Sequence, residues 1–362
     1  MSAASTNVRV TTYNVLSSQL ARSDYFTFCN PKWLQASHRL GKIKEKMEVE
    51  VAKKSIICLQ EVSTYWAGNL HSYFAARGYH FITGLYGSKF NGYMGVGVAV
   101  PMSEYDIIDA DVTRVADTKK MVRAPKKTGL QLLVSEYIYW PFMRLIKALG
   151  WYKPPKDVWD EATNRFNQMV MVRLRPKALP RGLSQQLGEA EQASTSASFV
   201  VGTYHMPCIF RIPQIMMIHC SLSAQLIHKY AAGSPYVYCG DFNIKPDSAM
   251  YLLLRDGSVS PTIPEYPKMQ EGDSWLPDVA PLKSAYVQCA GKEPEYTNNA
   301  RIVNEEPFIE TLDYIFTSSA HDWKVDKVQE LGTKAAVTGP LPSEEEPSDH
   351  VLLSADMRLN LD

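Results

Sequence analysis

The alternation of apolar and polar residues along the chain predicts strands interleaved with helices. Residues 9–15 alternate and are rich in Val and Thr, as in a half-buried strand. Residues 34–53 instead place Leu40, Ile43 and Met47 on one helical face. Further strands are predicted at 56–62, 95–100, 168–174, 199–205, 236–242, 311–316 and 350–357, and further helices at 65–77, 213–230 and 247–255. Mixed strands and helices with connections of unequal length are typical of an α/β fold that is not a regular doubly wound sheet.

Two insertions, near 119–160 and 183–198, interrupt this order. Within the first, residues 130–152 (LQLLVSEYIYWPFMRLIKALGWY) are apolar and aromatic. We expect a packed helical element there, with a lid over the site or an interfacial membrane helix as alternatives. The second insertion, LSQQLGEAEQASTSAS, is polar and low in complexity and predicts a mobile loop. No internal repeat is visible, so residues 1–362 are expected to form a single domain.

The charge balance limits the partners. Lys and Arg number 38, as do Asp and Glu, so the net charge is +0. A neutral chain has no overall attraction to nucleic acid or to an anionic membrane, so a local patch or a bound metal must attract an anionic substrate. Basic groups at 119–127 and 173–181 are candidates for such a patch, and a solvated face is the alternative.

The cysteines and the apolar runs indicate the cellular compartment in which the protein is expected. None of the six cysteines forms a C-x-x-C pair, which argues against a zinc site and favours a reducing compartment. The N-terminus runs into a predicted strand by Val8, leaving no room for a signal peptide, and no long uncharged apolar run predicts a membrane span. We therefore expect a cytoplasmic or nuclear location.

Several apolar strands end in polar or acidic residues. These are Asn14 in TTYN, Glu61 in CLQE, Asp241 and Asn243 in YCGDFN, and Asp349 and His350 in PSDH. A strand end places a carboxylate at a rim, and Mg²⁺ prefers carboxylate and amide oxygens, with phosphoryl oxygens completing its shell. Each residue alone also fits a structural role, such as a turn for Asn14 or a core position for His205. The residues by themselves therefore permit a metal or acid–base site without showing that they meet.

Six blocks occur in a defined order between Val8 and Met357: TTYNVLS, ICLQEV, the His of GTYHMPC, CGDFN, LDYIF and PSDHVLLSADM. This ordered set resembles the endonuclease/exonuclease/phosphatase superfamily, which includes pancreatic deoxyribonuclease and the sphingomyelinases. The stretch GDFNIKPDSAMYLLLRDGSV, followed by LKSAY and EPEYTN, resembles the deadenylase branch with nocturnin and the angel proteins. The resemblance implies a four-layer α/β sandwich of two mixed β-sheets flanked by helices, as in pancreatic deoxyribonuclease.

The resemblance also implies roles at the metal and the attacking water. Glu61 and Asp349 are implied as the metal carboxylates, for Mg²⁺ or Mn²⁺. Asn14 is implied to lie beside Glu61 as a substrate-binding residue. Asp241 and Asn243 are implied to orient the attacking water and to touch the phosphate or the metal.

Further roles concern the phosphate and the base. His205 is implied to contact the phosphate, and Asp313 to orient His350, which faces the scissile phosphate; such a carboxylate fixes the tautomer of its histidine. Phe308 is implied to stack on a substrate base, although a core position is the alternative. Asn298, or alternatively Asn243, is implied to offer an amide to the base.

The expected function is a Mg²⁺-dependent phosphodiesterase, a 3′-5′ exoribonuclease that acts on single-stranded RNA as a monomer. Phe210 stands where the deadenylases carry a proline beside the base, so polyadenylate specificity is not implied. One alternative is a phosphatase or phosphodiesterase on a nucleotide or on a 2′ or cyclic phosphate. Another is a sphingomyelinase-like lipid enzyme with residues 130–152 as its membrane contact. The intact metal and histidine set argues against a degenerate scaffold.

Overall fold

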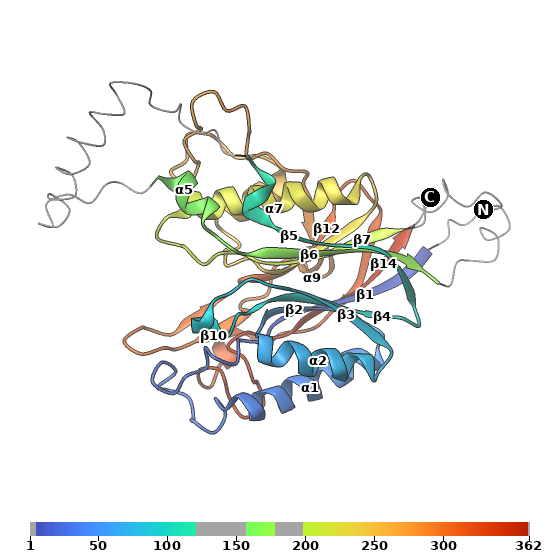
Figure 1. The fold of residues 1–362 in the computed structure, drawn as a ribbon, viewed down its shortest axis with the longest axis vertical. Helices are drawn as coiled ribbons and strands as arrows, with labels where there is room; N and C mark the ends of the chain where they lie inside the picture. The colour runs from blue at the N-terminus through green and yellow to red at the C-terminus, as the bar shows by residue number, and fades with distance from the viewer. Residues whose placement is uncertain (1–4, 121–156, 178–197, 361–362) are drawn as a thin grey trace, which may run out of the picture.

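Two six-stranded β-sheets face each other, and helices cover their outer faces (Figure 1). The computed structural model describes residues 5–120, 157–177 and 198–360. The apolar segment 130–152 and residues 183–197 of the polar insertion lie outside the described residues. Within the described ranges, no helix is long and apolar enough to cross a membrane.

The first sheet has the strand order β13-β14-β1-β2-β4-β3. Its strands are β1 (Ser5–Asn14), β2 (Ile56–Val62), β3 (Tyr79–Leu85), β4 (Gly95–Pro101), β13 (Trp323–Val328) and β14 (Leu353–Asn360). β1 runs parallel to β2 and antiparallel to β14, so the sheet is mixed. Helices α1 (Ala36–Ala52) and α2 (Thr64–Ala75) pack on its outer face.

The second sheet has the order β5-β6-β7-β8-β12-β9 and is also mixed. Its strands are β5 (Tyr105–Arg114), β6 (Gln168–Pro176), β7 (Phe199–His205), β8 (Tyr236–Asp241), β9 (Leu282–Ser284) and β12 (Asp313–Ser318). Helices α5 (Val158–Thr163), α7 (Pro213–Ala231) and α8 (Ala249–Asp256) pack on its outer face, and α9 (Ala285–Ala290) follows β9. A two-stranded hairpin, β10 (Asn298–Ala300) and β11 (Phe308–Glu310), stands apart from both sheets. The expected four-layer sandwich is confirmed.

The two-residue period of each central strand divides its side chains between two cores. In β2, Ile56 and Cys58 face the opposite sheet, whereas Ile57 and Leu59 face the helices. Gln60 lies between the sheets, and its Nε2 donates to the Oγ1 atoms of Thr12 at 3.0 Å and Thr203 at 2.9 Å. One side chain thus joins β1 and β2 to β7 across the sandwich.

The strands that the pattern predicted are the eight interior ones of the two large sheets, and it missed the four edge strands of those sheets and both strands of the β10–β11 hairpin. β3, β13, β5 and β9 occupy the outer positions of the two sheets. An edge strand buries less of each face and carries charged residues that block pairing with another chain. WKVDKV in β13 and YDIIDADVTR in β5 show this composition. The strand predicted from His350 begins at Leu353 instead.

Arg39 of α1 is completely buried between the helix and the loops at one end of the first sheet. Its guanidinium donates to the backbone carbonyls of Val15, Leu16 and Pro347 and lies 5.0 Å from the Trp66 ring centroid. Burial lowers the pKa of Arg39 to about 10 against the opposing negative charges nearby. One charged side chain therefore fixes the segment that leaves β1 and the segment that precedes Asp349.

Arg39→Ala should lower the free energy of unfolding by about 3 kcal/mol or more, because four buried carbonyl groups, that of Ser17 included, lose their donor. Arg39→Lys should not restore it, since one ammonium cannot reproduce the geometry of the fork. Urea unfolding measures both. Arg255→Ala, which removes an exposed arginine from α8, is the matched control and should leave unfolding nearly unchanged. An Arg39→Ala protein as stable as this control would contradict the assignment.

Candidate active site

The carboxyl ends of two pairs of parallel strands meet at one end of the sandwich. Asn14 ends β1 opposite Gln60 of β2, and His205 ends β7 opposite Asp241 of β8. Parallel neighbours end at the same edge of a sheet, so each sheet brings its polar terminal residues together. The β10–β11 hairpin lies at this end of the molecule (Figure 1). Strand direction therefore places three of the predicted site residues, Asn14, His205 and Asp241, at the same end of the sandwich.

Asn14 joins the two sheets through its side-chain amide. Its Nδ2 donates to Asp241 Oδ2 at 2.9 Å and to Glu61 Oε1 at 3.2 Å. Its Oδ1 accepts from the Leu16 amide at 2.9 Å, which fixes the orientation of the group. The Ser17 amide donates to Glu61 Oε2 at 2.9 Å. A neutral amide thus holds two carboxylates from different sheets beside each other.

Glu61 reaches this position through a break in strand regularity. By alternation it would share the helix-facing side of β2 with Ile57 and Leu59. A β-bulge shifts the pairing with β4 between Gln60 and Val62, and Glu61 has a φ of +60°. A bulge bends the strand and redirects a side chain. The carboxylate therefore turns to the rim, and Glu61 is only 9% exposed.

Two histidines from different segments approach the same oxygen of Asp241. The Nε2 atom of His205 lies 3.5 Å from Asp241 Oδ2, and the Nε2 atom of His350 lies 3.7 Å from it. Both rings are buried, and the Nδ1 atom of His205 has no hydrogen-bond partner among the described residues. The predicted His205, Asp241 and His350 thus form one compact group.

Asp313 contacts His350, the histidine that the resemblance implies it orients. Its Oδ2 lies 2.7 Å from His350 Nδ1 and also accepts from Thr297 Oγ1 at 2.7 Å. Burial lowers the pKa of His350, but Asp313 and then Asp241 oppose it and raise that pKa well above its ordinary value. Asp313 therefore favours the charged form of His350, whose Nε2 atom lies 3.7 Å from Asp241 Oδ2.

Asp349 lies half-buried next to His350. Burial raises the pKa of its carboxyl group, with Glu61 adding to the rise and with His350 and Arg39 opposing it. The effect of Glu61 shows that these two carboxylates repel each other. Ligand atoms of Asp241, Asp313 and His350 lie within 4.8 Å of one another, a second grouping that could hold an ion. Closely spaced carboxylates of this kind fit a divalent cation.

Asn243 follows Asp241 in a left-handed conformation, with a φ of +53° that Asn tolerates well. Its backbone amide donates to Asp241 Oδ1 at 2.9 Å, and its Nδ2 donates to the Met206 carbonyl at 2.9 Å. These bonds hold the carboxylate of Asp241 in a fixed orientation. The turn therefore explains why Asp and Asn stand two residues apart.

The hairpin contributes the remaining predicted residues. Asn298 is buried, forms a backbone bridge with His350, and has a side-chain Oδ1 without a partner among the described residues. Phe308 is 42% exposed, so the alternative of a core phenylalanine is wrong. It pairs with Ala300 on a two-stranded hairpin too small to cover the ring. Lys245, which sequence reasoning missed, places its Nζ 5.6 Å from the ring centroid of Phe308.

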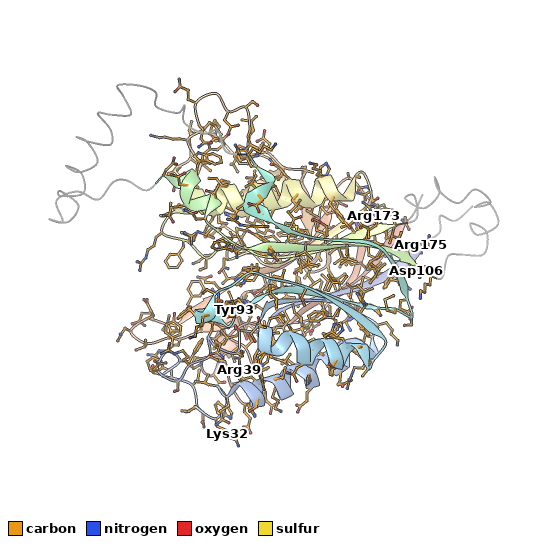
Figure 2. All side chains as sticks on the ribbon, viewed as in Figure 1. Lys32, Arg39, Tyr93, Asp106, Arg173 and Arg175 are labelled. Carbon is orange, nitrogen blue, oxygen red and sulfur yellow. The ribbon has the colours of Figure 1, made fainter. Side chains whose placement is uncertain are left out.

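The described part of the basic group at 173–181, residues 173–177, does not flank this site, and residues 178–181 lie outside the described residues. Arg173 donates to Ser234 Oγ at 2.8 Å, and both Arg175 and Lys177 pair with Asp106. Figure 2 shows Arg173, Arg175 and Asp106 at the end of the sandwich opposite the hairpin. In the other group, Lys119 pairs with Asp273, and residues 121–127 lie outside the described residues.

Two sequence relatives align with nearly all of the chain and with about a third of it, respectively. It is 27% identical over 380 residues to carbon catabolite repressor protein 4 homolog 1 of Arabidopsis thaliana, covering 96% of this chain and 57% of that relative. It is 34% identical over 131 residues to 2′,5′-phosphodiesterase 12 of Bos taurus, covering 35% of this chain and 20% of that protein. The chain thus spans little more than half the length of the first relative and less of the second.

Solved structures share the fold. ANGEL2, described as a 2′,3′-cyclic phosphatase, superposes with a TM-score of 0.68 at 20% identity, over 99% of this chain and 97% of that one. The human Nocturnin catalytic domain gives a TM-score of 0.57 at 18% identity, over 97% and 93%. A family model matches residues 11–350, which include Glu61, His205 and His350. The chain therefore belongs to the Endonuclease/Exonuclease/phosphatase family.

Proposed function

We propose that this protein is a Mg²⁺-dependent phosphodiesterase, most specifically a 3′-5′ exoribonuclease that acts on single-stranded RNA. The observation that carries the proposal is the group around Asp241, whose Oδ2 faces two histidines and the amide of Asn14. Family membership and the names of the relatives, a carbon catabolite repressor protein 4 homolog and a 2′,5′-phosphodiesterase, support phosphoester chemistry.

Glu61 and Asp349 would hold the metal. Glu61 accepts from the Asn14 side-chain amide and from the Ser17 backbone amide, and its Oε1 lies 4.0 Å from His205 Nε2. The charge of Glu61 raises the pKa of Asp349, so the two carboxylates repel each other. A divalent cation would relieve that repulsion, so the donor set fits Mg²⁺ or Mn²⁺. When bound, the ion would polarise a phosphoryl oxygen and offset its negative charge.

The other side chains would act on the water and the phosphate. Asp241, fixed by Asn14 and the turn at Asn243, would align a water for in-line attack. His350 would donate its Nε2–H to a phosphate oxygen, since Asp313 occupies its Nδ1. His205 would contact a second oxygen, so that two donors stabilise the charge that develops there.

The hairpin would bind the base. Phe308 offers an exposed face for stacking, and the buried Oδ1 of Asn298 offers an acceptor that a base amino group would satisfy. Lys245 and Lys334 both pair with Glu310 beside this ring, so two cationic side chains share one carboxylate there. A pure phosphatase has no need of such a surface.

The 34% identity to a 2′,5′-phosphodiesterase favours one alternative, a substrate with a 2′,5′ linkage or a 2′ or cyclic phosphate. The same metal and histidine set would serve it. Turnover of 3′,5′-linked and 2′,5′-linked oligoadenylates, mixed-sequence RNA and a 2′,3′-cyclic end, compared side by side, decides between the two. Preference for the 2′,5′ linkage or the cyclic end would replace the proposed substrate.

Mg²⁺ should raise the melting temperature of the wild-type protein, because it binds only where the carboxylates are assembled. At a hundred times its dissociation constant the gain is about 2.7 kcal/mol. Glu61→Gln should remove most of this gain and lower turnover by orders of magnitude, whereas Glu48→Gln, an exposed glutamate on α1, should do neither. Full turnover in EDTA would overturn the metal assignment.

The His350–Asp313 pair predicts a pH-dependent stability, measured in chelator. A histidine whose folded pKa is raised contributes stability that is complete below its unfolded pKa of about 6.5 and is lost as pH rises through the folded value. Asp313→Asn should therefore cost most stability below about pH 6.5, and the difference from wild type should shrink at alkaline pH. A difference that grows with pH would show that His350 is neutral.

Phe308→Ala should weaken oligonucleotide turnover by ~1–3 kcal/mol, from lost stacking. A phosphodiester without a base should be hydrolysed as before, and the melting temperature should hold because the ring is exposed. Kinetics on both substrates and a melting curve test this. Equal losses on both substrates would show that Phe308 binds no base.

A further inference from the structure

Every exposed aromatic side chain among residues 5–120, 157–177 and 198–360 lies at the active-site end of the sandwich. These residues are Tyr25, Phe28, Tyr65, Phe90, Tyr93, Phe166, Phe210 and Phe308. Their loops follow β1, β2 or β7, join β3 to β4, precede β6 or form the β10–β11 hairpin. In Figure 2, Tyr93 lies toward this end, whereas Arg173 and Arg175 mark the opposite one. The site is therefore surrounded by rings.

Three of these rings form a cation–π contact with a basic side chain. The Cζ atom of Arg301 lies 3.7 Å from the Phe28 centroid, and that of Arg114 lies 4.8 Å from the Phe166 centroid. The third pair is Lys245 with Phe308. Exposed rings interleaved with cations are typical of surfaces that bind single-stranded nucleic acid.

Arg301 differs from the other two cations because it has no anion. Lys245 pairs with Glu310 at 2.7 Å, and Arg114 pairs with Asp117 at 3.0 Å. In the part of the chain that the structure describes, Arg301 has neither a hydrogen bond nor an ion pair, and its Nε atom is buried. A buried guanidinium N–H without an acceptor is costly. A ligand that brings an anion to the guanidinium group would offset its unpaired charge.

Arg301 also lies close to the reacting centre. The Asn299 amide donates to the Asp349 carbonyl at 2.8 Å, and Arg301 follows two residues later, about 7 Å along an extended chain. The Tyr25 carbonyl accepts from the Val303 amide at 2.8 Å, which holds the loop of Phe28 against the hairpin. A strand with one phosphate at the site could therefore reach both side chains.

We propose that Phe28 and Arg301 form a subsite for a nucleotide flanking the scissile bond of a single-stranded nucleic acid. A base stacks on the exposed ring, and a phosphate oxygen accepts from the guanidinium. The phosphate can be an internal diester or a terminal monoester, since the guanidinium recognises either. This subsite rests on the proposed function. It extends that function to the part of the substrate beyond the cleaved nucleotide.

The test compares a decanucleotide RNA with a dinucleotide, each with and without a terminal phosphate. Arg301→Ala should lower kcat/KM on the decanucleotide roughly tenfold or more, the loss of a charge-assisted hydrogen bond. The plain dinucleotide should change by less than about twofold, because it has no flanking phosphate. Arg301→Lys should recover only part, and Phe28→Ala should resemble Arg301→Ala. Arg358→Ala is the control, an exposed arginine opposite Asn7 at the far end of β1.

Binding of the decanucleotide in EDTA separates this subsite from the proposed function. Log affinity decreases with log salt concentration, and this decrease should be less steep by about 0.7 in Arg301→Ala, as for one lost phosphate contact on a single strand. If wild-type protein cleaves no RNA, the proposed function fails while this slope still tests the subsite. A loss with the plain dinucleotide equal to that with the decanucleotide, or an unchanged slope, overturns the proposal. Wild-type flotation with anionic liposomes that Arg301→Ala and Phe28→Ala abolish would instead assign the surface to lipid.

Discussion

The site depends on a buried guanidinium that touches none of the reacting groups. Arg39 binds backbone carbonyls from the end of β1 and from the segment before Asp349, so it places Asn14 and Asp349 relative to each other. Its charge also opposes the raised pKa of Asp349. Because its hydrogen-bond partners are carbonyls rather than carboxylates, the positive charge is not neutralised by direct contact. The charge therefore remains available to offset the negative charges of Asp349 and Glu61.

Electrostatic strain at the site follows from the way two sheets are joined. Asp241 comes from one sheet and Glu61 from the other, and both accept from Asn14. The chain as a whole is neutral, so the negative charge gathered here is a local property. An amide can bridge two carboxylates but cannot neutralise them, which leaves a place suited to a cation and, through it, to a phosphate.

The sequence predicted the centre of the fold better than its margins. Interior strands are buried on both faces and appear as apolar runs, whereas β5 and β13 alternate charges because each borders solvent. The family blocks supplied the residues that meet around Asp241. They could not show that Glu61 needs a bulge to reach them. Arg39 did leave a signal, since it stands four residues before Ile43 on the buried face of α1, but a charge there breaks the apolar pattern.

The conformation of Glu61 has a consequence for how sequences of this fold can vary. A left-handed backbone is unfavourable for a side chain with a Cβ and a long stem, and glycine would adopt it with less strain. Selection for stability alone would therefore favour losing the carboxylate. In the proposed metal role, a chain that keeps glutamate there gives up folding free energy for chemistry, as proteins commonly do at strained active-site positions. A homologous chain relieved of catalysis would be expected to relax first at this residue, and glycine at position 61 would mark it.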